Sequence, residues 1–151
     1  MKILCATDFS DAGQAAEAHA ASLARALGAE LIYLHVSQET PLYGEGPLGT
    51  ADVERVYEAQ RRWASDTLAA RVAAAHARGL RARFALRRGA PHAEIVAACE
   101  DESPDMIVLG THGRSGLDRL LMGSVAERVV RTAPCPVLTV RPECDVTRFA
   151  A

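Results

Sequence analysis

Hydrophobic positions in this chain form short continuous runs that alternate with longer, helically spaced patterns. A strand that is buried on both faces reads as a continuous apolar run, so each short run predicts a strand of a covered sheet. Positions 80–87 instead alternate strictly between apolar and mostly arginine side chains, which predicts a half-exposed strand near a sheet edge. The predicted strands are Lys2–Thr7, Glu30–Val36, Leu80–Arg87, Met106–Leu109 and Val137–Arg141.

Helical patterns fill the intervals between these runs. The first is rich in alanine, with Ser10 suited to the N-cap and Gly28 to the left-handed position just past the last turn. The second has apolar residues at i, i+3 and i+4 over positions 51–78 and stops at Gly79. Glycines and prolines between positions 37 and 50 predict a surface loop. The predicted helices are Ser10–Leu27, Ala51–Arg78, Ala93–Cys99 and Ser124–Thr132.

The alternation of strands and helices predicts the fold class. It is typical of an α/β protein with an open five-stranded parallel sheet and helices on both faces. We expect a single domain over residues 1–142 and a loose tail over residues 143–151. In such sheets ligands bind beyond the carboxyl ends of the strands. If the first strand is central, Asp8, Val36 and Gly110 meet there.

Composition narrows the class of protein. The chain has 151 residues, of which 49% are apolar and 24% charged, and its net charge is −2. We expect no nucleic-acid or membrane partner, because the chain has no general positive charge and no run of the ~20 apolar residues that span a bilayer. The arginines at positions 78–88 predict a solvated strand face, with an anion or partner patch as the alternative. Asp8 comes too early for a signal peptide, so we expect a cytoplasmic protein.

Lysine and cysteine usage excludes several kinds of site. Lys2 is the only lysine among 17 basic residues, so the loop lysine of a P-loop nucleotidase and the Schiff-base lysine of a pyridoxal enzyme are both missing. The four cysteines do not have metal-ligand spacing. We expect Cys5 and Cys99 in the core, Cys135 and Cys144 exposed, and all four reduced.

Glycines are densest between Gly110 and Ser124, in the segment GTHGRSGLDRLLMGS, which holds four of the eleven. This segment follows a predicted strand and precedes a predicted helix. Glycine lets backbone N–H groups approach an anion, and a helix N-terminus adds unpaired donors and the positive end of a dipole. The segment therefore predicts a phosphate site, with the N–H and hydroxyl of Ser124 and the N–H of Val125 as donors.

The spacing of these glycines, G-x2-G-x9-G-S, resembles the universal stress protein family. The end of the first strand, Thr7-Asp8-Phe9-Ser10, and the closing segment from Ala133 to Arg141 resemble it too, so the likeness covers nearly the whole chain. It implies a Rossmann-like fold of the adenine nucleotide alpha hydrolase-like type, with strand order 3-2-1-4-5. It also implies ATP with Mg²⁺ or Mn²⁺, because members that keep this spacing bind ATP. Ala6 departs from many members, which have proline there, but Asp8 stays in place.

The resemblance also implies which residues hold the nucleotide. Asp8 and Val36 match the adenine and ribose side of the family site, Leu109 and Gly110 flank the nucleoside, and the later glycines match the phosphate side. The resemblance implies no catalytic or metal-ligating residue. The full set of predicted binding residues is Ala6, Thr7, Asp8, Val36, Leu109, Gly110, Gly113, Arg114, Gly123, Ser124 and Val125.

Several residues near this site have structural alternatives. Asp8 could instead cap the first helix. We expect His112 to be an exposed loop residue rather than a catalytic base, and His35 to be a hydrogen-bonded core histidine. Trp63 is expected to pack on its neighbours or to cover the mouth of the pocket. Arg119 could reach phosphate or lie on the surface.

Three functions fit the sequence. The resemblance implies a regulatory, ATP-binding protein of the stress response that forms a homodimer through the apolar edge strand Val137–Arg141. An ATP hydrolase or phosphotransfer enzyme needs a nucleophile, a metal-binding carboxylate and charge stabilisation. Asp8, His112, Arg114 and Asp118 do not form such a set by their spacing, so we expect at most slow hydrolysis. The third function is a dimeric interaction module that binds no nucleotide. ATP, ADP, AMP and cyclic nucleotides would all present adenine to the same pocket.

Overall fold

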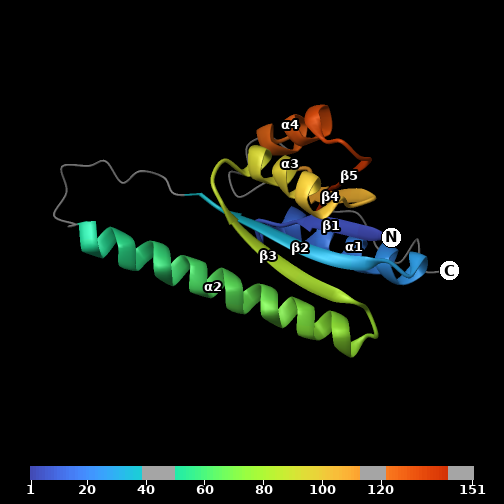
Figure 1. The fold of residues 1–151 in the computed structure, drawn as a ribbon, viewed down its shortest axis with the longest axis horizontal. Helices are drawn as coiled ribbons and strands as arrows, with labels where there is room; N and C mark the ends of the chain where they lie inside the picture. Colours follow the sequence, from blue (N-terminus) through green and yellow to red (C-terminus); the bar gives the residue numbers. More distant parts are fainter. Residues whose placement is uncertain (39–49, 113–121, 143–151) are drawn as a thin grey trace.

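The computed structural model describes residues 1–38, 50–112 and 122–142, and in these ranges strands and helices alternate along the chain. The strands form one parallel sheet in the order β3-β2-β1-β4-β5 (Figure 1). This confirms the predicted α/β class, the open parallel sheet and the strand order. The elements are β1 (Lys2–Ala6), α1 (Asp11–Leu27), β2 (Glu30–Ser37), α2 (Thr50–Ala77), β3 (Ala82–Arg88), α3 (Pro91–Glu102), β4 (Met106–Gly110), α4 (Ser124–Thr132) and β5 (Val137–Val140).

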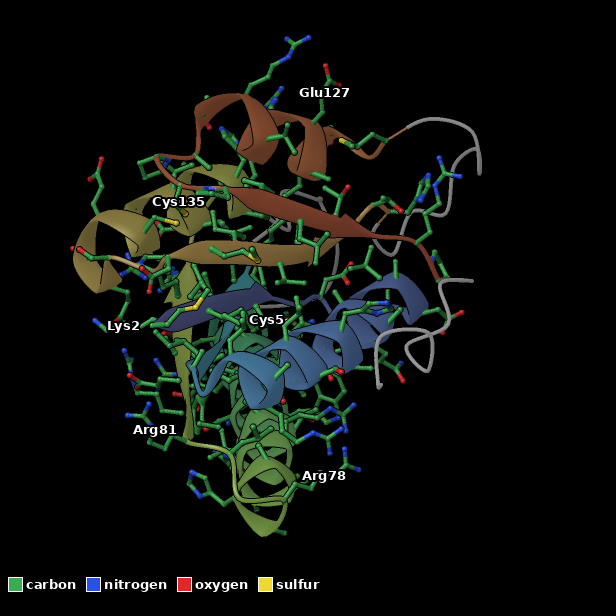
Figure 2. All side chains as sticks on the ribbon, turned by 90° about the vertical axis from the view of Figure 1, so that its right-hand side faces the viewer. Lys2, Cys5, Arg78, Arg81, Glu127 and Cys135 are labelled. Atoms are coloured by element: carbon green, nitrogen blue, oxygen red, sulfur yellow. The ribbon has the colours of Figure 1, made fainter. Side chains whose placement is uncertain are left out.

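Each face of the sheet has its own hydrophobic core. Successive residues of a strand point to opposite faces, so Ile3 and Cys5 of β1 pack with α1 and α2, whereas Leu4 and Ala6 pack with α3 and α4. Figure 2 shows the two layers, with α3 and α4 on one side of the strands and α1 and α2 on the other. Leu68 attaches the long helix α2 to the first of these cores and is fully buried. Burial of a side chain of this size stabilises the fold by roughly 1.5–3 kcal/mol.

Helix α1 begins after Ser10 and ends before Gly28, as predicted from the sequence. Ser10 is the N-cap, and its hydroxyl accepts a hydrogen bond from the Gly13 N–H at 3.1 Å. Gly28 follows the last turn with a φ of 61°, a left-handed conformation that glycine adopts without a Cβ penalty. Helix α3 is longer than predicted. It begins at Pro91, because proline lacks only an N–H that the first turn leaves unpaired, and it ends before Ser103, whose φ is 47°.

Strand β3 is an edge strand, and the residues along it are only half-buried, as predicted. Arg83 binds Glu30 at 2.8 Å and also pairs with Glu102, whose carboxyl pKa is lowered by the hydrogen bond from Arg83. Arg78 and Arg81 lie at the turn between α2 and β3 (Figure 2). The arginines of β3 are therefore part of a solvated, ion-paired face, and the partner-patch alternative is not needed to explain them.

The cysteines follow the predictions in part. Cys5 and Cys99 are buried, and burial raises the pKa of the Cys99 thiol to about 12. Cys135 is half-buried against the α3 and α4 core, so the prediction that it is exposed was wrong. Cys144, most of the predicted loop and the tail lie outside the described residues. In the described ranges, no helix is both long enough and apolar enough to cross a membrane.

Candidate functional site

A pocket of about 600 Å³ opens at the carboxyl ends of the central strands, a typical volume for a small-molecule site. Ala6, Leu34 and Leu109 lie side by side in the sheet register, and the residues that follow them line the pocket. The lining includes nine of the predicted binding residues, namely Ala6, Thr7, Asp8, Val36, Leu109, Gly110, Gly123, Ser124 and Val125. The other two, Gly113 and Arg114, lie outside the described residues, as do Asp118 and Arg119.

The turn from β1 to α1 holds Asp8 in place. Its Oδ1 atom accepts hydrogen bonds from the Ser10 N–H at 3.1 Å and from the Ser10 hydroxyl at 2.6 Å. A Cβ atom on Gly13 would lie only 2.8 Å from the same oxygen, so glycine at this position makes room for the carboxylate. Asp8 thus supports the helix cap, which is Ser10, and lines the pocket as well, so the two interpretations of this residue are compatible.

A buried carboxylate lies beneath this turn. Glu17 of α1 has a side chain that is only 8% exposed, and it accepts a hydrogen bond from the Thr7 hydroxyl at 2.6 Å. Arg71 of α2 donates to the other oxygen of Glu17 at 2.7 Å. A buried charge is costly unless it is paired in this way. Thr7 was predicted to belong to the nucleotide site, and it lines the pocket. Its hydroxyl also links the end of β1, through Glu17, to both helices on that face.

The end of β2 is bound to the same turn. The Nδ1 atom of His35 lies 2.8 Å from the Thr7 carbonyl oxygen, and the Thr7 N–H donates to the Leu34 carbonyl at 2.9 Å. His35 is hydrogen-bonded as predicted, but it is half-buried and lines the pocket rather than lying in the core. Its ring packs on Phe9, with the ring centroids 4.6 Å apart.

The described ends of the glycine-rich segment are bonded directly to each other. The Gly123 N–H donates to the Thr111 carbonyl at 2.8 Å, and the Thr111 N–H donates to the Val140 carbonyl at 2.8 Å. A Cβ on Gly110 would lie 2.7 Å from the Ala12 carbonyl carbon, so this glycine is needed for close packing against α1. The sequence predicted that Gly110 flanks the nucleoside; it lines the pocket, but its missing side chain serves helix packing.

Helix α4 points an uncapped N-terminus at the pocket. Its N-cap is Gly123, which has no side chain to accept a hydrogen bond, and its backbone is extended there, with φ −63° and ψ 148°. The N–H groups of the next three residues, Ser124, Val125 and Ala126, have no carbonyl one turn earlier in the helix, and all three residues line the pocket. Such amides, together with the helix dipole, form a ready anion site.

Sequence reasoning missed several lining residues. Thr111 is buried and connects the ends of two strands with α4. His112 is half-buried, with its Nδ1 atom 2.9 Å from the Thr111 hydroxyl, so the expectation of an exposed loop residue was wrong. Gln60 and Trp63 enter the lining from α2. Trp63 was expected to pack on its neighbours or to cover the mouth of the pocket, and it both packs on Phe9 and lines the pocket.

Among the described residues, the ionisable side chains that line the pocket are Asp8, His35 and His112. Across the described ranges, no group of three or more His, Cys, Asp or Glu side chains is placed to hold a metal ion. The arrangement can therefore accept hydrogen bonds at the carboxylate and donate them to an anion at α4.

The fold and the pocket define a Rossmann-like α/β protein with a pocket at the carboxyl edge of its sheet. The sequence profile of the Universal stress protein family matches residues 1–141. A universal stress protein of Methanocaldococcus jannaschii is 35% identical over 140 residues, which cover 93% of this chain and 81% of that protein. The chain belongs to the universal stress protein family.

Solved structures of the family have the same architecture. The universal stress protein UspA of Lactobacillus plantarum superposes with a TM-score of 0.82 at 27% identity, covering 93% of this chain and 97% of that one. A universal stress protein in complex with cAMP superposes at 0.68 with 25% identity, covering 93% and 96% of the two chains. The universal stress protein of Archaeoglobus fulgidus in complex with dAMP superposes at 0.62 with 26% identity, covering 93% and 97%.

Proposed function

We propose that this chain binds an adenine nucleotide in the pocket, with ATP and a Mg²⁺ or Mn²⁺ ion as the expected ligand. In this proposal it acts as a regulatory stress protein rather than as a dedicated enzyme. The observation that carries the proposal is the uncapped N-terminus of α4, which opens on the same pocket as Asp8 and Val36. Related chains that hold cAMP and dAMP support it.

The two sides of the pocket suit the two ends of a nucleotide. Asp8 offers a carboxylate, which accepts a hydrogen bond from an amino group such as that of adenine. On the other side, Ser124, Val125 and Ala126 offer amides to phosphate. Hydrogen bonds to a charged group contribute roughly 1.5–3 kcal/mol each. Three of them, less the cost of immobilising the ligand, support an affinity on the order of micromolar. Gly113 and Arg114 belong to the proposed phosphate side through the family resemblance.

We also propose that two chains pair through β5, the last strand of the sheet over the described residues. The carbonyls of Pro136 and Val140 accept hydrogen bonds from the β4 side, at Ile107 and Thr111. Because backbone groups of a strand alternate between its two sides, the N–H groups of Val137, Thr139 and Arg141 point to the open edge. A strand edge with exposed donors invites pairing with a second chain.

Isothermal titration calorimetry with ATP, ADP, AMP and cAMP tests the proposal. We expect saturable binding of at least one of them with one site per chain. If none of the four nucleotides gives measurable heat of binding, nucleotide binding is contradicted. The nucleotide-independent interaction module is then the function that remains. Single-turnover release of phosphate from ATP with Mg²⁺ tests the choice between binding and catalysis. A rate in the ~1–10³ s⁻¹ range of ordinary enzymes would overturn the regulatory role.

A further inference from the structure

Three aromatic rings form a continuous series, and the two outer rings, His35 and Trp63, line the pocket. His35 is fixed by the Thr7 carbonyl, Phe9 packs on His35 at 4.6 Å, and Trp63 meets Phe9 edge-on at 5.1 Å, with an angle of 80° between the planes. Trp63 lines the pocket and is nevertheless 53% exposed. Trp63 therefore presents a large, partly exposed aromatic ring in the lining of the pocket.

The backbone at Phe9 supports a functional interpretation of this series. Phe9 has a φ of 63°, a left-handed conformation that a bulky residue rarely adopts. It is held there by hydrogen bonds from its own N–H to the Thr7 hydroxyl and from the Gln14 side chain to its carbonyl. Strained residues of this kind persist only where the surroundings fix them, and they cluster at binding sites. The strain at Phe9 places its ring between His35 and Trp63.

Helix α2 is attached firmly enough to serve as a pocket wall. Ala64 and Leu68 are buried against the sheet, and Arg71, two turns beyond Trp63, binds the buried carboxylate of Glu17. The N-terminal half of α2 extends past the carboxyl ends of the strands (Figure 1). Gln60 lies one turn before Trp63 on this half, so the two side chains share a face, and both line the pocket.

We propose that Trp63 and Gln60 form a base-recognition wall, in which the indole ring stacks on the purine base and the Gln60 amide hydrogen-bonds to its edge. This inference rests on the proposed nucleotide binding and deepens it. The proposed position of the phosphates sets the orientation of the nucleotide, because α4 lies on one face of the sheet and α2 on the other. A nucleotide whose phosphates meet α4 therefore extends its base toward α2. An uncharged aromatic surface beside an amide that both donates and accepts suits a base better than a phosphate.

The test compares variants of the full chain by calorimetry with ATP. We expect Trp63→Ala to weaken ATP binding about tenfold, the order of effect seen when one base–aromatic stacking contact is lost. Trp63→Phe keeps a ring and should recover most of that loss, and Gln60→Ala should weaken binding several-fold. Val56→Ala is the matched control, because Val56 is an exposed apolar residue of the same helix that is not part of the lining. It should bind ATP like the unmodified chain.

Fluorescence gives a second readout, because Trp63 is the only tryptophan. ATP should change its emission, whereas inorganic tripolyphosphate, which has no base, should not. Wild-type affinity for ATP in Trp63→Ala would overturn the wall and leave the proposed function standing. The wall would also be overturned if Trp63→Phe did not recover the ATP affinity lost in Trp63→Ala, or if that loss came with a lower unfolding temperature. Either result would indicate a structural role for Trp63. If the unmodified chain binds no adenine nucleotide, the proposed function fails first and the wall fails with it.

Discussion

Replacement of Gly123 by aspartate should change stability and nucleotide affinity in opposite directions. Gly123 is the N-cap of α4, and its extended backbone, with φ −63° and ψ 148°, is one that any residue adopts. An aspartate there can accept a hydrogen bond from the N–H of Val125 or Ala126, as N-cap side chains do. These are the amides proposed to bind the phosphates. The variant therefore fills the proposed phosphate site with a carboxylate from the chain itself.

Both effects can be given a size. Aspartate at an N-cap is more stable than glycine by a few tenths of a kcal/mol, and a negative charge at the first turn adds about 0.3–1 kcal/mol. A gain of about 0.5–1.5 kcal/mol raises the Tm of a chain of this length by about 1–6 °C. Against ATP, the variant loses at least one charge-assisted hydrogen bond, about 1.5 kcal/mol. It also adds a repulsion of about 1 kcal/mol even at the dielectric constant of water. Together these weaken binding on the order of 70-fold.

Calorimetry and thermal unfolding measure the two effects on one preparation. Adenosine is the control ligand, because it has no phosphate and should bind the variant and the unmodified chain alike. Ala90→Asp is the control variant. Ala90 is the N-cap of α3, is likewise extended and uncapped by a side chain, and does not line the pocket. Ala90→Asp should raise the Tm and largely keep ATP affinity. Wild-type ATP affinity in Gly123→Asp, or an equal loss in both variants, would refute the assignment of phosphate to α4.

Three further predictions test other parts of the account. Gly13→Ala brings a Cβ within 2.8 Å of the Asp8 carboxylate and should weaken ATP binding about tenfold. In the control Gly28→Ala, a Cβ meets nothing within 4 Å but φ is 61°, so this variant should lose about 1 kcal/mol of unfolding free energy and keep its ATP affinity. Calorimetry measures the affinities and urea unfolding the stabilities, and equal affinities in the two variants would contradict the role of Gly13. Burial, followed by the nearby Cys5 and Glu17, raises the pKa of Tyr33 to about 12. The unfolded chain ionises this phenol near pH 10, so stability should fall between about pH 10 and pH 12 and fall less in Tyr33→Phe; identical urea midpoints against pH for the two proteins would speak against it. Thr139→Pro removes an edge N–H of β5 and should shift the sedimentation coefficient from that of a dimer to that of a monomer. The control Thr139→Val keeps this N–H and should stay dimeric. If the proline variant is still a dimer, the interface lies elsewhere.

The sequence predicts the fold well because most of its signals are local. Ser10 and Gly28 mark the ends of α1 by requirements of a single turn, and both were confirmed. The alternation of apolar and arginine side chains predicted a half-exposed strand near an edge, and β3 is an edge strand whose residues are intermediate in burial up to Arg87. Helix α3 was predicted too short because Pro91 fits either a turn or a first helical position. Its far end at Ser103 is a left-handed residue with no glycine to mark it.

The strand order and the nucleotide site came from the family resemblance more than from spacing. Hydrophobic periodicity shows which face of α2 meets the sheet, but not how far the helix extends past the strands. Gln60 was therefore missed as a lining residue, whereas Trp63 was expected to pack or to cover the mouth of the pocket. The bond between Gly123 and Thr111 depends on how β4, β5 and α4 meet in space, and nothing in the segment between them signals it. The role of Gly110 is similar, because only the packed structure shows Ala12 against it.

In the proposed complex, one nucleotide lies across the pocket with its base toward Asp8 and its phosphates on α4. Amide chemical shifts in ¹⁵N-labelled protein, titrated in parallel with ATP and with adenosine, test this most directly. Both ligands should shift the amides next to Asp8 and Val36, and only ATP should shift those of Ser124, Val125 and Ala126. Two results would contradict this arrangement: adenosine shifts the α4 amides, or ATP shifts the amides at neither end of the pocket.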